Sequence, residues 1–364
     1  MPPSPKAAAH PKASAAHRVR IVEDARYQHH IAPEGHPERP ERLVAVGEAI
    51  DEFRDRATIV APRPATPEEI ARVHAHQMID VLADTQTAEP GHLDADTYYS
   101  PLSYEVARLA AGGSIDLVRQ ILGGEIQSGL AAIRPPGHHA EANRSMGFCL
   151  FNNVAVAVRA AQAEMGQPRI LVFDWDVHHG NGTQHSFEDD PDVLYISTHQ
   201  FPFYPGTGDF GEIGTGRGEG TTLNLPMPPG CGDAEYLGLV QRIIVPAAHA
   251  FAPDLILISC GFDAHRDDPL ASMDLTLEGY RGMATLMRAL AESLCGGRIA
   301  HILEGGYALS GVREGATAVL ESLTAETLPA LPAETELEPG SALRRMVDRA
   351  VEVHGGRIPG LGAL

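Results

Sequence analysis

The chain has 364 residues, of which 43% are hydrophobic, and its 28 Lys and Arg against 48 Asp and Glu give a formal net charge of −20. This length can bury a large core, and so acidic a chain disfavours binding to nucleic acid or anionic lipid; the charge suits cationic partners or serves solubility alone. The four cysteines are far apart and form no CxxC pair, which favours a reducing cytoplasm.

The N-terminal segment 1–17 is rich in Pro, Ala and Ser and has no apolar core long enough for a signal peptide. No later stretch is apolar enough over sufficient length to span a bilayer. We expect a disordered tail over 1–17 and a single domain over 18–364. Within that domain the core is expected at about 27–325, followed by a linker and short helix over 326–364.

From residue 19 onwards short apolar runs alternate with longer helical patterns, which predicts an α/β fold with a central, mostly parallel sheet flanked by helices. Strands are predicted at 19–22, 129–133, 169–173, 193–198, 255–259 and 300–303. Helices are predicted near 39–57, 104–122, 152–165, 233–251, 276–295, 310–323 and 342–353. The glycine-rich stretch 207–222 is predicted to be a surface loop.

Four predicted strands are followed directly by polar or glycine-rich residues. In chain order these segments are RPPGHHA (134–140), DWDVHHGN (174–181), CGFDAH (260–265) and EGGY (304–307). Ligands bind at the carboxyl edge of open α/β sheets, so we expect the four segments to converge in one active site at that edge.

Asp176 and His178 are spaced i, i+2, which places both side chains on one side of an extended segment, and Asp263 follows a different strand. Two carboxylates and an imidazole suit zinc or another first-row divalent ion and leave a position open for water. The first two alone could equally form a salt bridge at the sheet edge, and Asp263 tips the balance towards a metal. Asp174 is expected to orient a histidine, with the role of further ligand less favoured.

His138 and His139 follow a rigid RPPG turn, so we expect two separately oriented imidazoles rather than a chelating pair. Next to a metal, a histidine whose far nitrogen is held by a partner becomes a general base or acid. Asp174 and Asn181 are the candidate partners. Away from a metal, such histidines are usually ordinary core or surface residues.

Tyr307 follows two glycines, which allow close backbone approach, and its phenol could donate a hydrogen bond to a developing oxyanion. Phe148 and Tyr204 could form apolar walls. Each of these aromatic residues taken alone is more often a plain packing residue, and the surrounding motifs favour the functional role.

Seven motifs together resemble the histone deacetylase superfamily, in particular its class II branch and the related bacterial deacetylases and acetylpolyamine amidohydrolases. They stand in the family's order over about residues 27 to 310, and they imply an arginase-like α/β fold. The motifs are HPERPERL (36–43), RPPGHHA (134–140), GFCLFNN (147–153), DWDVHHGNGTQ (174–184), YISTH (195–199), GFDAH (261–265) and LEGGY (303–307).

The resemblance also implies roles for individual residues. It makes Asp176, His178 and Asp263 the ligands of one catalytic Zn²⁺, with Fe²⁺ as an alternative. It implies that His139, paired with Asn181, is the general base. It implies that His138, paired with Asp174, is the electrostatic partner of that base. Tyr307 is implied to polarise the scissile carbonyl.

Further positions follow from the same resemblance. Arg39 is implied beside an internal cavity behind the metal. The implied substrate tunnel comprises Gly147 (through its carbonyl), Phe148, Tyr204, Gly306, Leu270 and Asp96, with Asp94 as an alternative to Asp96. One or two structural K⁺ ions are implied, the first near Asp174, Asp176, His178, Ser197 and Thr198, the second near Phe187, Asp190 and Val193.

We therefore expect a zinc-dependent deacetylase that releases acetate from acetyl-lysine or from a small acetylated amine such as a polyamine. Leu270 stands where polyamine-selective relatives carry an acid, which argues against that route to polyamine selectivity. Two alternatives are a binuclear manganese ureohydrolase, for which an Asp-x-Asp at Asp263 is missing, and a non-catalytic acyl-lysine binding module. We expect a cytoplasmic protein without nucleic-acid or membrane partners, and a homo-oligomer is compatible with the sequence.

Overall fold

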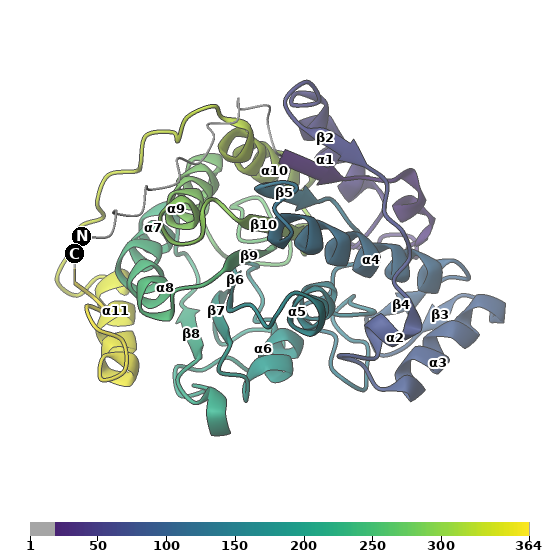
Figure 1. Ribbon diagram of the computed structural model, residues 1–364, viewed down its shortest axis with the longest axis horizontal. Helices are drawn as coiled ribbons and strands as arrows, with labels where there is room; N and C mark the ends of the chain where they lie inside the picture. The colour runs from purple at the N-terminus through teal and green to yellow at the C-terminus, as the bar shows by residue number, and fades with distance from the viewer. Residues whose placement is uncertain (1–18, 364) are drawn as a thin grey trace, which may run out of the picture.

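The fold is built on an eight-stranded sheet in the order β2-β1-β5-β10-β9-β6-β7-β8, in which all neighbouring strands are parallel (Figure 1). The computed structural model describes residues 19–363, so the predicted tail over 1–17 lies outside the described residues. The parallel sheet confirms the predicted fold class.

Six strands were predicted, and all six lie in the sheet. They are β1 (Val19–Val22), β5 (Ser128–Ala131), β6 (Ile170–Asp174), β7 (Val193–Gln200), β9 (Leu255–Cys260) and β10 (Ile299–Leu303). The two edge strands, β2 (Thr58–Val60) and β8 (Thr222–Met227), were not predicted, and neither was the small antiparallel pair β3 (Gly91–His92) and β4 (Tyr98–Tyr99). The strands β5, β6, β9 and β10 are buried along their whole length, which is why their sequences are nearly continuous apolar runs.

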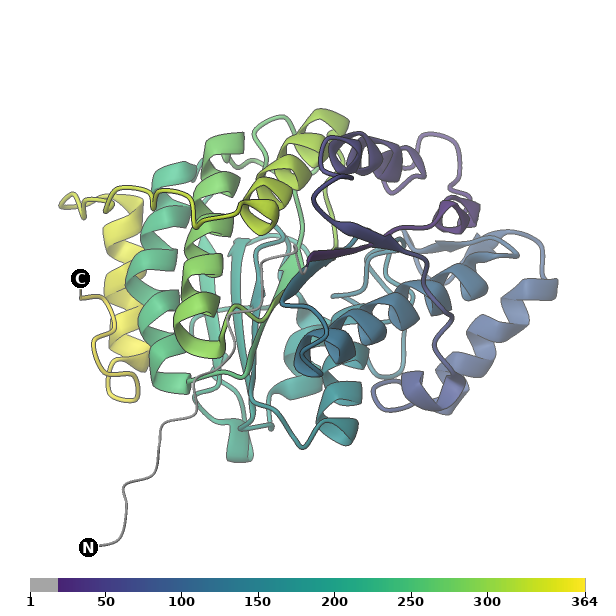
Figure 2. The ribbon, with the colours of Figure 1, turned by 45° about the horizontal axis from the view of Figure 1, so that its top comes forward.

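Helices cover both faces of the sheet (Figure 2). One layer contains α1 (Glu41–Asp51), α10 (Leu309–Thr324), α9 (Leu277–Cys295), α7 (Asp233–Leu239), the π-helical turn η4 (Val240–Ile244), α8 (Val245–Phe251) and α11 (Ala342–His354). The other contains α4 (Ser103–Leu122), α5 (Asn153–Glu164) and α6 (Asn181–Phe187). Shorter elements outside the two layers are α2 (Pro67–Ile70), α3 (His76–Asp84), η1 (Ala25–His29), η2 (Thr85–Thr87) and η3 (Gly216–Gly218).

Side-chain caps explain several helix starts. Asn152 accepts the amide of Ala155 at the start of α5, and Ser341 accepts that of Arg344 at the start of α11. α1 is shorter than the predicted 39–57 because it begins only after Pro40 and gives way to turns beyond Asp51. The predicted loop 207–222 contains the short helix η3, and its last residue begins β8.

The four cysteines are all buried and free. Within residues 19–363, no helix combines the length and the apolar character needed to cross a membrane.

Candidate active site

The four strands that carry polar residues at their ends are neighbours in the sheet, in the order β5, β10, β9, β6. Because they run parallel, their carboxyl ends meet at one edge, where the segments 134–139, 174–181, 261–263 and 304–307 leave the sheet. Glycine permits their close approach: a Cβ on Gly261 would lie 2.1 Å from Oδ2 of Asp176.

Asp176, His178 and Asp263 are buried and offer ligand atoms within 4.8 Å of one another. Nδ1 of His178 lies 3.2 Å from Oδ1 of Asp176 and 3.1 Å from Oδ2 of Asp263. Main-chain amides orient both carboxylates: Val177 donates to Asp263 and Gly305 to Asp176, each at 2.8 Å. The structure thus brings the three predicted metal ligands together.

The charge of this group also fits a divalent cation. Burial and the neighbouring Asp176 raise the pKa of Asp263 to about 7, since two adjacent buried carboxylates repel each other. A cation between them would offset that repulsion, and two carboxylates with one imidazole suit Zn²⁺ or Fe²⁺. Gly305 leaves the space open, because a Cβ there would lie 2.3 Å from Asp263 and 2.6 Å from Asp176.

Asp174 is directed towards His138. Its Oδ2 lies 3.1 Å from Nδ1 of His138 and accepts the Tyr195 hydroxyl at 3.2 Å, while its Oδ1 accepts the amide of Asp176 at 3.2 Å. Both oxygens are therefore engaged, which favours the predicted partnership with His138 over a role as a further metal ligand. Burial opposes protonation of His138, but the charges of Asp176 and Asp174 outweigh it and raise the pKa of His138 to about 10.

His139 has a neutral partner instead. Its Nδ1 lies 2.8 Å from Oδ1 of Asn181, the first residue of α6. Burial, and then the neighbouring His138, lower the pKa of His139 well below its usual value. The two imidazoles are 4.0 Å apart and tilted by 42°, so they point to different partners.

Three of the residues predicted to line a tunnel lie beside these groups. Gly147 and Phe148 form a turn with φ of +57° and +67°, and glycine is needed because a Cβ at 147 would lie 2.4 Å from the ring of His139. The Phe148 ring packs edge-on against Tyr307 at 5.7 Å, and the Tyr204 ring lies 5.0 Å from that of His139.

Phe203 is a neighbour that the sequence analysis missed. Its ring stacks on the imidazole of His178 at 5.4 Å with an interplanar angle of 18°. The signal lay in the same aromatic run as Tyr204, and only one residue of that run was selected.

Tyr307 is held through its own backbone and that of its neighbours. The carboxylate of Asp268 accepts the amides of Tyr307 at 2.7 Å and Ala308 at 3.0 Å, and also the amide of Leu270 at 3.0 Å. The half-buried Leu270 is thereby tied to the loop that carries the phenol. Gly306 has φ of +114°, and burial raises the pKa of Tyr307 well above its usual value, so its hydroxyl remains a donor.

The interior arginine beside Tyr307 is Arg42, which corrects the prediction for Arg39. Arg39 is exposed, whereas Arg42 is fully buried, donates to the carbonyl of Gly306 at 2.5 Å and lies 5.1 Å from the Tyr307 ring. α1 begins at Glu41, so Arg42 falls in its first turn and on the face that packs inward.

Asp94 and Asp96 lie in the loop between β3 and β4. Oδ1 of Asp94 accepts the amides of Asp96 at 3.1 Å and Thr97 at 2.7 Å, which commits Asp94 to the turn. The hydroxyl of Thr97 accepts the amide of Phe148 at 3.1 Å, so this loop contacts the turn formed by Gly147 and Phe148. Asp96 is half-buried, and its Oδ1 accepts the Thr97 hydroxyl at 3.3 Å.

The residues predicted around potassium lie in two places. Asp174 and Ser197 are register partners on β6 and β7, and the buried hydroxyl of Thr198 has no hydrogen-bond partner within the described part of the chain. The hydroxyl of Ser197 lies 2.9 Å from Nδ1 of His199, so the Thr198 hydroxyl is the side-chain oxygen of this group that could serve a cation without giving up a hydrogen bond. At the second place, Asp190 is already paired with Arg159, whose guanidinium lies 4.7 Å from the Phe187 ring, and the amide of Val193 donates to the Asp190 carbonyl.

Two buried glutamates that were not predicted orient the site loops. Oε2 of Glu304 accepts the amides of Gly137 at 2.6 Å and His138 at 3.1 Å, which fixes the backbone of the histidine pair. Glu38 binds Arg134 through two hydrogen bonds of 2.6 and 2.7 Å. Both acids lie within the quoted motifs HPERPERL and LEGGY, where no role was assigned to them.

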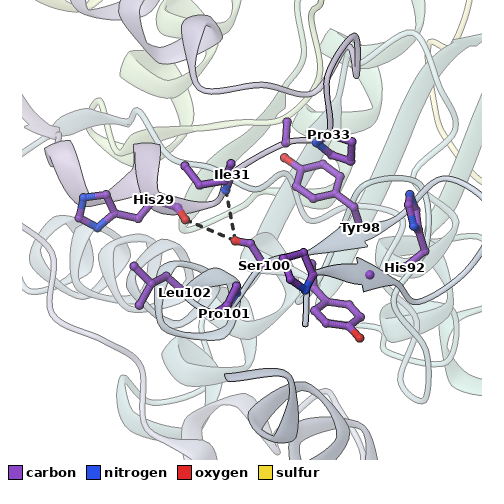
Figure 3. Close-up of a pocket in the computed structure, with 12 residues that line it drawn as sticks. His29, Ile31, Pro33, His92, Tyr98, Ser100, Pro101 and Leu102 are labelled. Atoms are coloured by element: carbon purple, nitrogen blue, oxygen red, sulfur yellow. Dashed lines mark hydrogen bonds between the residues drawn. The ribbon is translucent and has the colours of Figure 1, made fainter. Parts of the chain in front are cut away.

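A separate apolar pocket of about 590 Å³ lies beside the β3–β4 hairpin (Figure 3). The hydroxyl of Ser100 accepts the amide of Ile31 at 3.3 Å and ties two of its walls together. None of its lining residues was predicted as a site residue. They are His29, Ile31, Ala32, Pro33, Pro90, Gly91, His92, Tyr98, Tyr99, Ser100, Pro101 and Leu102.

Comparison with known proteins adds independent findings. A family model described as histone deacetylase domain matches residues 36–323. The chain is 43% identical over 303 residues to histone deacetylase 15 of Arabidopsis thaliana, covering 81% of this chain and 54% of that protein. It is 40% identical over 329 residues to human polyamine deacetylase HDAC10, covering 84% of this chain and 48% of that protein. The chain thus spans about half the length of these two relatives.

Among solved structures, a crystal structure described as the HDA15 HD domain is similar with a TM-score of 0.87 at 39% sequence identity. The match covers 95% of this chain and 97% of that one.

Proposed function

The chain belongs to the histone deacetylase family, and from that premise we propose that it is a metal-dependent amidohydrolase that removes acetyl or short acyl groups from an amine. The proposed substrate is acetyl-lysine in proteins or peptides, and the products are acetate and the free amine. The observation that carries the proposal is the convergence of Asp176, His178, Asp263, the two histidines and Tyr307 at one buried sheet edge.

Asp176, His178 and Asp263 would hold the catalytic ion, which we propose to be Zn²⁺, with Fe²⁺ as the alternative. When bound, such an ion supplies Lewis-acid polarisation of the amide carbonyl and of a water molecule. Within the described residues no second group of three such ligands lies close enough together to hold another ion, which disfavours a binuclear ureohydrolase.

His139 would act as the general base. Its Nδ1 faces Asn181, so Nε2 is the nitrogen left to take a proton from water. The protonated imidazole then returns that proton to the departing amine. His138, charged beside Asp174, would stabilise the negative charge that develops during the reaction.

Tyr307 would donate a hydrogen bond to the oxyanion of the tetrahedral intermediate. Its burial keeps the phenol protonated, and the loss of one such donor costs about 3–4 kcal/mol of transition-state stabilisation. Gly147, Phe148 and Tyr204 would enclose the acyl chain, and Asp96 would contact the substrate backbone at the rim.

We further propose that K⁺ binds near Asp174, Ser197 and Thr198 and supports the ligand loop from beneath. Proteins or peptides carrying acetyl-lysine are the proposed partners, and a cytoplasmic location remains a prediction.

The test is turnover of acetyl-lysine peptides and N-acetylated polyamines side by side, with metal-analysed protein and a Tyr307→Phe control. We expect peptides to be hydrolysed faster, and kcat of the control to fall about 10²- to 10³-fold. Faster turnover of acetylpolyamines would overturn the substrate proposal and the argument from Leu270. A metal-loaded protein that turns over neither substrate would favour an acyl-lysine binding module.

A further inference from the structure

Asn181 has a second neighbour on the side away from His139. Its Nδ2 lies 2.5 Å from Oε1 of Glu141 and 3.3 Å from the main-chain carbonyl of His139. Glu141 follows the histidine pair by two residues, and its own amide donates to the carbonyl of Arg144 at 3.0 Å, which anchors its backbone. The Asn181 amide is therefore clamped between a glutamate and a histidine.

The donor and acceptor rules give this clamp a direction. A carboxylate can only accept, so the NH₂ end of the Asn181 amide must face Glu141 and its oxygen must face His139. That oxygen in turn requires a proton on Nδ1 of His139, which leaves Nε2 free of one. A turned-over amide would offer its NH₂ to Nδ1 and place the proton on Nε2. Two acceptors oppose that orientation, and Glu141 at 2.5 Å is much closer to Nδ2 than the main-chain carbonyl of His139 at 3.3 Å.

Glu141 is itself held in its ionised form. Nδ1 of His185 lies 2.9 and 3.1 Å from its two carboxylate oxygens. Asn181 and His185 are four residues apart on α6, so both face the glutamate from adjacent turns. Burial alone would raise the pKa of Glu141, but the hydrogen bonds from His185 and Asn181 outweigh it and hold that pKa below its usual value.

We propose that Glu141 is a positioning residue, which fixes the proton of His139 on Nδ1 by orienting the amide of Asn181, and that His185 holds Glu141 in place. The inference rests on the proposed function and extends it to two residues that need not touch substrate. A carboxylate can only accept, so Asp174 by itself fixes the proton of His138 on Nδ1. The neutral amide of Asn181 can face either way, and Glu141 supplies the orientation that lets it fix the proton of His139 on Nδ1.

The first test is Glu141→Met, which keeps the side-chain length and removes the acceptor. We expect kcat for an acetyl-lysine peptide to fall about 10- to 100-fold, because a larger fraction of His139 carries its proton on Nε2 and cannot act as the base. KM should change little, because the residues proposed to enclose the acyl chain are unchanged. Glu141→Gln keeps one acceptor oxygen and should retain most of the activity. A Glu141→Met variant with unchanged kcat would overturn the proposal.

The second test repeats the change in an Asn181→Asp background. An aspartate can only accept, so it needs no orienting group, and Glu141 becomes a repulsive neighbour. Glu141→Met should then leave kcat unchanged or raise it. The matched control is Glu212→Met, since Glu212 also accepts a side-chain amide, that of Gln184, at 2.7 Å, but does not face Asn181. Its effect should be equal in both backgrounds, and an equal loss for Glu141→Met would show a merely structural role.

A direct measurement of the proton position on the wild-type protein does not depend on turnover. In ¹⁵N-histidine-labelled, zinc-loaded wild-type protein, with His139→Ala used for assignment, the imidazole nitrogen shifts report which nitrogen carries the proton. We expect Nδ1, and a proton on Nε2 would overturn the inference. Absence of hydrolysis by the wild type would instead count against the proposed function, and this measurement would still decide the tautomer.

Discussion

His138 and His139 are adjacent in the sequence, yet Nδ1 of His138 is hydrogen-bonded to the carboxylate of Asp174 and Nδ1 of His139 to the amide of Asn181. The carboxylate region favours a charged imidazolium, whereas the amide region supplies a hydrogen bond and no charge. The charges of Asp176 and Asp174 outweigh burial and raise the pKa of His138, whereas burial and the neighbouring His138 lower the pKa of His139 despite its hydrogen bond with Asn181. The charges around each ring, together with its hydrogen-bond partner, therefore distinguish two histidines that are adjacent in the sequence.

Removal of the metal is expected to reduce activity the most, because the ion would polarise both the amide carbonyl and the water molecule from which His139 takes a proton. Dialysis against a chelator should reduce hydrolysis of an acetyl-lysine peptide to background, and addition of Zn²⁺ or Fe²⁺ should restore it. Metal content is measured in the same samples. Full activity in metal-free protein would contradict the assignment of Asp176, His178 and Asp263 as ligands.

Removing each histidine in turn tests whether their roles differ. His139→Ala should lower kcat about 10²- to 10⁴-fold, the range for loss of a general base, and His138→Ala should lower it less. Steady-state kinetics on one peptide are sufficient. A larger loss for His138→Ala would reverse the assignment of base and electrostatic partner.

Asn181→Asp gives His139 a carboxylate partner like that of His138 and should therefore reduce the difference between the pKa values of the two histidines. Asn181→Asp places a negative charge beside His139 and therefore raises its pKa. Because the unprotonated form is the base, activity that was present at lower pH is lost, and the acidic limb of the pH profile of kcat/KM moves up by about one to two pH units. An unmoved limb would mean that His139 does not carry the titrating proton.

The smallest effect is expected at Arg39, which is exposed and whose side chain makes no hydrogen bond or ion pair with any of residues 19–363. Arg39→Met should change the free energy of unfolding by no more than about 0.5 kcal/mol. The same substitution at Arg42 leaves Glu38 short of one of its buried partners and should cost about 3–5 kcal/mol. Denaturant unfolding of both variants measures the difference, and equal costs would contradict the correction from Arg39 to Arg42.

The interior of the sheet could be predicted because its strands are buried on both faces and read as apolar runs. The edges could not: β2 has three residues, and β8 contains Pro226, which is tolerated at an edge but obscures a strand pattern. The candidate ligands and histidines followed from polar residues placed at strand ends. Their supports did not, since Glu141, Glu304 and Arg42 act through partners more than 35 residues away in the sequence.

The sequence alone also did not distinguish Arg39 from Arg42 as the buried arginine. Both belong to one motif, and only the position at which α1 begins decides which of them faces inward. Phe203 and Tyr204 are likewise adjacent, and the path of their loop determines that both rings reach the site.

The strand order has a consequence for the biosynthesis of the protein. β10 is hydrogen-bonded to both β5, whose loop carries the two histidines, and β9, which precedes Asp263. A chain growing from its N-terminus therefore holds both histidines and all three candidate ligands before the strand that joins the two halves of the sheet has been made. Residues 299–307 provide that strand and Tyr307 together, so the synthesis of one short segment supplies both the central strand and the last candidate catalytic residue.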